Sequence, residues 1–369
     1  MPRYEIWHTD DAGNRLALLN TTVGFDYTLV DGDVGWLNVP MPYDPSQIYN
    51  NPQVDQRIHI YRAPDYGSLQ LAAVGFLRRW GKTTTNNGLS TVQLGGADPN
   101  ELLKRRIIAY YDRTDYSIKD GPADDVMKAF ARENFGSLAT DTDRDMSALG
   151  VTVESDLSLG PNIGIASAHE NLLAVMQEIQ QTTRANGDEV FWRMRPETAT
   201  SFIFEAKTGQ PGADRTFGGN NPLYFGTEFG NISNAQIQTL YDEEQNFIYA
   251  GGPGEGVLQN IQSASDAGAI SASRWNRREG WVSASQADTV AKVEDAAAAG
   301  LVSRRAQTKF TADLIPTILT PFGGTGWWLG DKIAVSHLGR QIDAIIRMVR
   351  VMVAANGLET VTARVEAVL

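Results

Sequence analysis

The residues that could bind a nucleotide are few, and the nearest match to a known motif is Gly81-Lys82-Thr83. A phosphate-binding P-loop requires a glycine, four residues and then Gly-Lys-Ser/Thr at the start of a helix. Here five residues separate Gly75 from Gly81, and the stretch LQLAAVGFLRRWGKTTTNNG is typical of a strand and a turn. We therefore do not predict a nucleotide site at Lys82.

Two loops resemble ligand-binding loops only in part. Gly251–Gly256 follows a predicted strand, as a dinucleotide fingerprint would, but Pro253 interrupts it and the glycine spacing is wrong. Asp141–Asp145 carries an acid at every second position, as an EF-hand loop does, but Met146 and Thr152 stand where glycine and glutamate are needed. We interpret the first as a flexible glycine loop and the second as a solvated acidic loop.

No arrangement of catalytic residue types stands out. The chain has no cysteine, which excludes thiolate catalysis, disulfides and cysteine-ligated metals. It has no Gly-x-Ser-x-Gly motif, and its 44 acids give no reason to prefer one carboxylate pair for sugar hydrolysis. We predict no catalytic residue, no metal and no cofactor. None of the four histidines has metal-ligand spacing; they are His8, His59, His169 and His337.

Composition places the chain among soluble multidomain proteins. Its 369 residues suggest two to four domains, and 42% are hydrophobic. No apolar run approaches the roughly 20 residues of a membrane span, and the N-terminus has no secretory signal pattern. The net charge of −12 predicts that the surface repels nucleic acid rather than binding it.

Strand patterns dominate both ends of the chain, and helical patterns occur mostly between them. Asn87-Gly88 and Asn356-Gly357 are typical of type I′ hairpin turns. Helices are predicted from capping signals and apolar stripes at about 100–105, Pro122–Phe135, after the capping box Ser167–Glu170, and from Gln286 to Ala299 before Gly300. Strands are predicted at 3–8, 25–30, 36–39, 57–61, 69–80, 90–94, 189–195, 201–205, 236–241, 247–250, 331–338, 341–353 and 358–369.

The stretch GTGWWLGDKIAV, residues 324–335, raises the question of a ligand platform. Neighbouring side chains of an extended chain point to opposite faces, so Trp327 and Trp328 could not form one flat platform in a strand. Ile333 and Val335 would share one face. We interpret the stretch as the entrance to a β-barrel with material packed on both sides, which indicates assembly rather than catalysis.

An ordered set of segments resembles phage tail proteins of the baseplate-hub or tail-tip group, including siphophage minor tail proteins. The one departure is after GGPGEG, where an arginine is expected and Val257, Leu258 and Gln259 follow. The segments, in chain order, are VGFDYTLVDGDVGWLNVPMP, DQRIHIYRAPDYGSLQLAAVGFLRRW, DPNELLKRRII, GPADDVMKAFARENFG, DEVFWRMRPE, GGPGEG and WWLGDKIAV.

This resemblance implies an α+β multidomain fold in which β-barrel-like tube domains carry an inserted mixed α/β domain. It implies a homotrimer whose two barrels per subunit form a ring of near-sixfold symmetry, joining a tail tube to a central spike or fibre. Expected partners are the distal tail or tube protein, the spike or fibre, and the tape measure protein. DNA would pass through the lumen without specific binding, along a wall that we expect to be acidic. The location would be the phage tail of the virion, assembled in the host cytoplasm.

The first hypothesis is therefore a structural hub that is not an enzyme, with Trp36, Trp327 and Trp328 as assembly anchors. The alternative is a tail-associated glycan-binding or cell-wall-degrading protein, although the chain leaves no room for an appended domain of that kind. A cellular β-rich enzyme is a weaker third possibility. The predicted domains are a barrel-like tube domain at 1–111, a mixed α/β peripheral domain at 112–200, a second tube domain at 201–305 with helix 286–299, and a hairpin region at 306–369.

Overall fold

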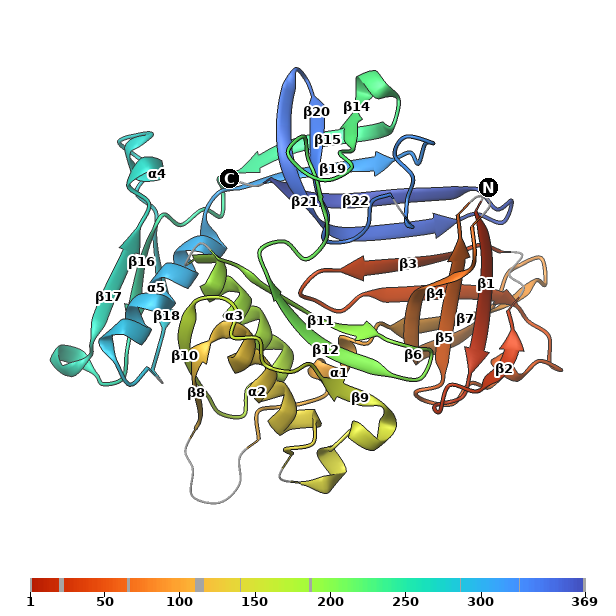
Figure 1. Ribbon diagram of the computed structural model, residues 1–369, viewed down its shortest axis with the longest axis horizontal. Helices are drawn as coiled ribbons and strands as arrows, with labels where there is room; N and C mark the ends of the chain where they lie inside the picture. Colours follow the sequence, from red (N-terminus) through yellow and green to blue (C-terminus); the bar gives the residue numbers. More distant parts are fainter. Residues whose placement is uncertain are drawn as a thin grey trace.

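The computed structural model describes residues 2–19, 23–64, 67–109, 116–139, 141–185, 188–285, 287–324 and 326–367. The fold is α+β, as predicted: strands from both ends of the chain build one large sheet, and helices lie beside it (Figure 1). The boundaries predicted at residues 111, 200 and 305 remain predictions.

Fourteen strands of the described residues form the large sheet. It mixes the two ends of the chain because β3 pairs with β21, with Tyr27 opposite Val351. One hydrophobic core lies under both halves and includes Tyr27, Phe225 and Trp327. The strands are β1 Arg3–Thr9, β2 Arg15–Leu18, β3 Phe25–Val30, β4 Trp36–Pro42, β5 Arg57–Ala63, β6 Gln70–Thr84, β7 Ser90–Ala97, β13 Asp214–Arg215, β14 Tyr224–Gly226, β15 Ile232–Leu240, β19 Gln307–Leu314, β20 Lys332–His337, β21 Arg340–Val353 and β22 Glu359–Ala367.

Both predicted hairpins form, but with a different turn. Gly88 and Gly357 have φ of 81°, whereas Asn87 and Asn356 do not have positive φ. The amide of Gly357 donates to the Ala354 carbonyl, and Ala354 donates to Leu358, so three residues make the loop. This is a type I turn followed by a left-handed glycine, and the predicted type I′ turns are wrong.

A second core lies in the middle of the chain, where helices pack on a small sheet. Helix α2 covers Ala123–Phe135, as predicted, and buries Met127 and Phe130. The neighbouring elements are α1 Glu101–Lys104, β8 Ser117–Pro122, η2 Thr142–Arg144, η3 Ser147–Leu149, β9 Val151–Val153, β10 Asn162–Ser167, α3 Leu172–Ala185, β11 Val190–Pro196 and β12 Phe202–Thr208.

Helix α3 begins later than the capping box predicts. Ser167 does bond to Glu170, but its backbone completes β10 opposite Ser117. Asn171 instead accepts a hydrogen bond from the amide of Leu173 at 3.1 Å and caps the helix. Strand pairing therefore overrides the local capping signal.

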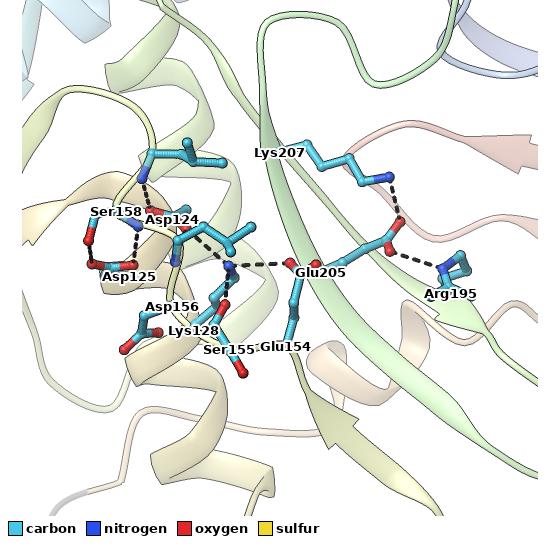
Figure 2. A network of polar contacts seen from close by, with 12 residues as sticks. Asp124, Asp125, Lys128, Glu154, Ser155, Asp156, Ser158, Arg195, Glu205 and Lys207 are labelled. Atoms are coloured by element: carbon cyan, nitrogen blue, oxygen red, sulfur yellow. Dashed lines mark hydrogen bonds and ion pairs between the residues drawn. The ribbon is translucent and has the colours of Figure 1, made fainter.

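A buried lysine fixes the loop beside α2 (Figure 2). Lys128 has no exposed surface, and its Nζ lies 3.0 Å from Asp124 and 3.2 Å from Glu154. Asp124 in turn accepts hydrogen bonds from the amides of Leu157 and Leu159. These contacts hold residues 154–159 against the helix.

A third, smaller unit follows β15. Its three-stranded sheet packs against α5, which starts at Val290 where Thr289 caps it, and continues past Gly300. Gly300 does not end the helix as predicted; a Cβ there would meet Val282 at 2.7 Å, so glycine permits close packing on the sheet. The elements are β16 Phe247–Gly251, η5 Gly256–Leu258, β17 Ile261–Ser265, α4 Ala267–Ser271, β18 Glu279–Ser283 and α5 Val290–Arg304.

Candidate assembly surfaces

Eight strands of the large sheet form a continuous run in the order β15-β19-β22-β21-β3-β4-β7-β6. Every neighbouring pair in this run is antiparallel. Because strand direction alternates, β15 and β6 at the two ends run in opposite directions. The run therefore offers two terminal edges of opposite polarity.

The two faces of this run differ in chemistry. Alternate residues such as Val361, Val351, Tyr27 and Leu37 are buried in the core. Residues that lie opposite one another in paired strands share a face, so the register also identifies the other side. One row on that open face runs Ser233, Asp313, Thr362, Arg350, Thr28 and Trp36.

The described side chains of the open face are balanced in charge rather than acidic. Arg350 lies 3.1 Å from Asp26, and Thr362 donates to Asp313 at 2.8 Å. The guanidinium of Arg79 lies 5.3 Å from the centre of the Trp36 ring. The described acids on this face, Asp26, Asp313, Asp343 and Glu366, are matched by Arg79, Arg347, Arg350 and Arg364.

The first terminal edge is the second half of β6. Its first half, Gln70–Phe76, pairs with β5, but from Arg79 to Thr84 it pairs only with β7 among the described strands. All residues from Arg78 to Thr84 are exposed. Trp80 lies opposite the buried Leu94, on the core side, yet 44% of it is exposed because no described strand continues the sheet beyond it.

The second terminal edge is β15, Ile232–Leu240. It pairs with β19, and no other described strand pairs with it. Ala235 and Ile237 pack on the core, while Gln236 and Gln238 are exposed. A register shift between Ser233 and Gln236 bends the strand near its start. Both edges leave backbone hydrogen-bonding groups free for another strand.

A buried ion pair joins the two halves of the large sheet. Arg62 in β5 contacts Glu359 in β22 through Nε at 2.8 Å and Nη2 at 2.9 Å, and donates to the Phe322 carbonyl at 2.8 Å. Tyr4 also donates to Glu359. Burial first, then the charge of Tyr27 and of Glu359, raises the pKa of Tyr4, so its hydroxyl stays protonated.

A second ion cluster joins both halves to the middle of the chain. Arg347 contacts Asp31 at 2.7 Å, Glu189 at 2.9 Å and Glu366 at 2.9 Å. Arg184 in α3 adds contacts to Glu189 and Glu366. Burial opposes the charge on Arg347, but Glu189 and Asp31 outweigh it and raise its pKa. These contacts fix the helices at one end of the sheet.

Asp98 stands between the sheet and α1, at the wall of a cavity of about 460 Å³. Burial raises the pKa of this carboxyl to about 7, although backbone hydrogen bonds from Gly35 and Asn100 act against the rise. Among buried histidines, His59 has its pKa lowered to about 4, mainly by burial and then by the charge of Arg57.

The three predicted anchors have different surroundings. Trp327 is fully buried against Phe225 and Phe322 inside its own chain, so it has no surface left for another subunit. Trp328 is half-buried and stacks on Phe322 at 4.8 Å. Both rings touch Phe322 because Gly326–Asp331 precedes β20 and is not a strand, so the predicted division onto opposite faces is wrong. Trp36 lies on the open face.

The motif-like segments also have ordinary positions. Gly81-Lys82-Thr83 lies in the free half of β6, in a strand as predicted, and Gly251–Gly256 links β16 to η5. In the acidic loop, the Asp141 side chain accepts a hydrogen bond from the backbone amide of Asp143, and the Asp145 side chain accepts one from the backbone amide of Ser147. The described residues contain no cluster of three or more acids and histidines placed to hold a metal. Sequence reasoning missed Trp80, because its exposure depends on where the sheet ends.

A family model of Siphovirus ReqiPepy6 Gp37-like proteins matches residues 3–365. The chain belongs to this family. A comparison with curated proteins finds no significant match. The family agrees with the resemblance to phage tail proteins seen in the sequence, and that resemblance is confirmed.

This chain has the fold of solved prophage tail proteins. It is similar to a tail protein from Neisseria meningitidis MC58, with TM-score 0.61, 12% identity, and coverage of 99% of this chain and 96% of the other. It is also similar to the 43 kDa tail protein of prophage MuSo2 from Shewanella oneidensis, with TM-score 0.61, 10% identity, and coverage of 98% and 97%. A third similar structure is prophage tail protein gp18 from Listeria monocytogenes EGD-e, with TM-score 0.53, 10% identity, and coverage of 98% of this chain and 94% of the other. None of the helices in the described residues is long and apolar enough to cross a membrane.

Proposed function

We propose that this phage tail protein is a non-enzymatic baseplate hub, in which three copies form a ring between the tail tube and a central spike or fibre. Each copy contributes the eight-strand run from β15 to β6. The three runs join edge to edge into a closed barrel whose lumen is lined by the open face. The small unit lies outside it, and the middle unit packs against the run at the end where Phe76 and Glu366 lie.

The observation that carries this proposal is the pair of unpaired edges at opposite ends of one antiparallel run. Pairing β6 of one copy with β15 of the next continues the alternation of strand direction. It also places core side beside core side, because Trp80 and Ile237 both lie on that face. Such a contact is heterologous, so repetition closes a ring when the rotation per copy is suitable.

The register of the strands in the run is compatible with a closed barrel made from three copies. Ser233 in β15 and Phe76 in β6 end one row of opposite residues across the run. The centre of the free β6 edge, Gly81, lies beyond Phe76, and the centre of β15, Gln236, lies beyond Ser233 in the other direction. Pairing the centre of β6 in one copy with the centre of β15 in the next shifts the register by roughly eight residues for every eight strands. A barrel whose shear equals its number of strands has strands tilted by about 36° from the axis.

The lumen of this ring differs from the acidic wall expected from composition. The described acids and arginines of the open face are equal in number and partly paired, so the face attracts DNA only weakly. Polar side chains such as Gln236, Gln238 and Thr362 complete it. A balanced polar wall suits passage of both DNA and a tape measure protein without retention.

Light scattering on the purified chain tests the stoichiometry. We expect a particle of three times 40.3 kDa that persists on dilution. Proline substitutions test the edge: successive amides of an edge strand point alternately toward β7 and away from it. Of Gly81→Pro and Lys82→Pro, the one whose amide points outward should dissociate the trimer while keeping the monomer fold. A monomer at every concentration, or trimers unaffected by both prolines, contradicts the proposal.

A further inference from the structure

The two ends of the eight-strand run carry different kinds of chain. At one end β7 leads into α1, β15 leads into the small unit, and α5 leads back into β19. At the other end, called the loop end here, β15, β22, β3 and β7 begin and β19, β21, β4 and β6 finish. In Figure 1 the loop end of β3, β19 and β22 is at the right, and the helical parts lie to the left and below. The loop end thus carries loops and 3-10 turns, among them residues 43–56 and 315–331, and no α-helix of the described residues.

Large apolar side chains are exposed along these connections. The most prominent are Ile318 and Leu319, with relative exposures of 99% and 83%. Their turn is fixed, because Thr320 donates its amide to Thr317 at 3.0 Å and the two hydroxyls lie 2.9 Å apart. Beside them is a hollow of about 590 Å³ lined by Phe229 and Tyr224. Nine exposed apolar residues of the loop-end connections are considered together: Val23, Tyr43, Ile48, Leu89, Phe229, Ile315, Ile318, Leu319 and Leu358.

The same connections are depleted of charge. Connections 43–56, 85–89, 227–231, 315–331 and 354–358 contain 46 residues, of which only Asp44, Asp55, Glu228 and Asp331 are charged. The whole chain is 21% charged, so about ten charges would be expected there. Charge depletion with exposed aliphatic and aromatic groups is the composition of an interface core rather than of a solvated surface.

The exposed area is sufficient for a specific contact. Each of the nine apolar side chains offers on the order of 100 Å², so one chain presents roughly 900 Å² of apolar surface. A standard interface buries about 800 Å² per partner, and isolated patches on monomers are usually smaller than this. The β6 and β15 edges do not use this surface, because they lie along the strands rather than at their ends.

We propose that the loop end is an axial docking face for another ring-shaped tail protein, whose facing surface is apolar and nearly uncharged. This inference rests on the proposed ring, which repeats the patch three times around one axis. A partner that contacts all three patches gains from multivalency, so each single contact can be modest. The turn at Ile318 and Leu319 is the central contact of each patch.

The test uses phage carrying a variant hub gene. Ile318→Asp with Leu319→Asp places two charges on the docking face and disturbs no contact inside the chain, since both side chains are exposed. We expect a hub with unchanged solution mass and a loss of at least tenfold in assembled tails. The matched control is Val257→Asp with Leu258→Asp, at exposures of 102% and 84% in the small unit, which should assemble at the yield of the unmodified phage.

A cross-link identifies the occupant. The chain has no cysteine, so Leu319→Cys provides one attachment point for a thiol-linked photocrosslinker in purified virions. A cross-link to a different tail protein supports the proposal. A cross-link to another copy of this chain, normal tails with the double variant Ile318→Asp and Leu319→Asp, or equal loss in the control overturns it. A changed solution mass would instead count against the ring, which separates the two proposals.

Discussion

Arg62 and Glu359 form a bidentate ion pair between residues 297 positions apart in the sequence, and both side chains are buried. Arg62 belongs to β5 and Glu359 to β22, so the pair links the N-terminal and C-terminal strands behind the open face. Tyr4 and the Phe322 carbonyl complete the site. The contact locks together the two halves that the proposed ring requires in one rigid unit.

Arg62→Met should therefore destabilise the chain strongly. It leaves the Glu359 carboxylate buried with only Tyr4 as a partner, and breaking a buried pair costs about 3–5 kcal/mol. Denaturant unfolding measures this loss. The double change Arg62→Met with Glu359→Gln should recover part of the stability. The control Arg350→Gln, which breaks an exposed pair with Asp26, should cost less than about 1 kcal/mol. Equal losses for Arg62→Met and Arg350→Gln would contradict this account.

Lys128→Met tests the buried cluster of Figure 2. Without the ammonium, Asp124 is left buried and uncompensated, so we expect a loss of about 3–5 kcal/mol in the free energy of unfolding. Hydrogen exchange should speed up first at the amides of Leu157 and Leu159, which donate to Asp124. Lys207→Met is the control, because Lys207 is one of three exposed cations around Glu205. Unchanged exchange at residues 157 and 159 would refute the assigned role.

Asp98 should make stability depend on pH. Its pKa is about 7 in the fold and about 3.9 in the unfolded chain, so the folded state holds the proton more tightly. The contribution is complete below pH 4 and is lost as pH rises through 7. His59, with a folded pKa of about 4, acts oppositely: its contribution is present above pH 6.5 and lost as pH falls.

The comparison of two variants separates these groups. Asp98→Asn keeps a side-chain acceptor for the Asn100 amide and should remove the decline in melting temperature between about pH 4 and 7. His59→Gln should instead reduce the loss of stability between pH 6.5 and 4. If Asp98→Asn leaves the pH profile of the melting temperature unchanged, the carboxyl is not protonated in the folded state near neutral pH.

Local patterns were enough to predict individual elements. The alternation of Val361, Ala363 and Val365 identified the buried face of β22, and the stripe containing Met127 and Phe130 identified α2. Errors arose where tertiary contacts outweigh local signals. Ser167 satisfies a capping box but is held in β10, and Gly300 sits inside α5 because the helix packs closely on Val282.

The assembly surfaces could not be predicted from local patterns. The pairing of β3 with β21 joins residues more than 300 positions apart, and no periodicity records it. Trp327 and Trp328 are adjacent in the sequence, yet both rings contact Phe322 within the same chain. The exposure of Trp80 follows from the strand order, because the second half of β6 has no described neighbour beyond β7.

Trp80→Ala gives the sharpest test of the ring. Trp80 lies on the core side of the free β6 edge with 44% of its surface exposed, so in the ring it would pack beside Ala235 and Ile237 of the next copy. Large aromatic anchors at an interface centre commonly contribute about 2 kcal/mol or more. We therefore expect the association constant of each of the three interfaces to fall by about 30-fold. Analytical ultracentrifugation should then show the trimer dissociating at concentrations where the unmodified chain stays trimeric, with little change in monomer unfolding. Trp281→Ala, at 48% exposure on the small unit, should leave the trimer intact. If the two variants have the same association constant, Trp80 lies outside the interface and the β6 edge does not close the ring.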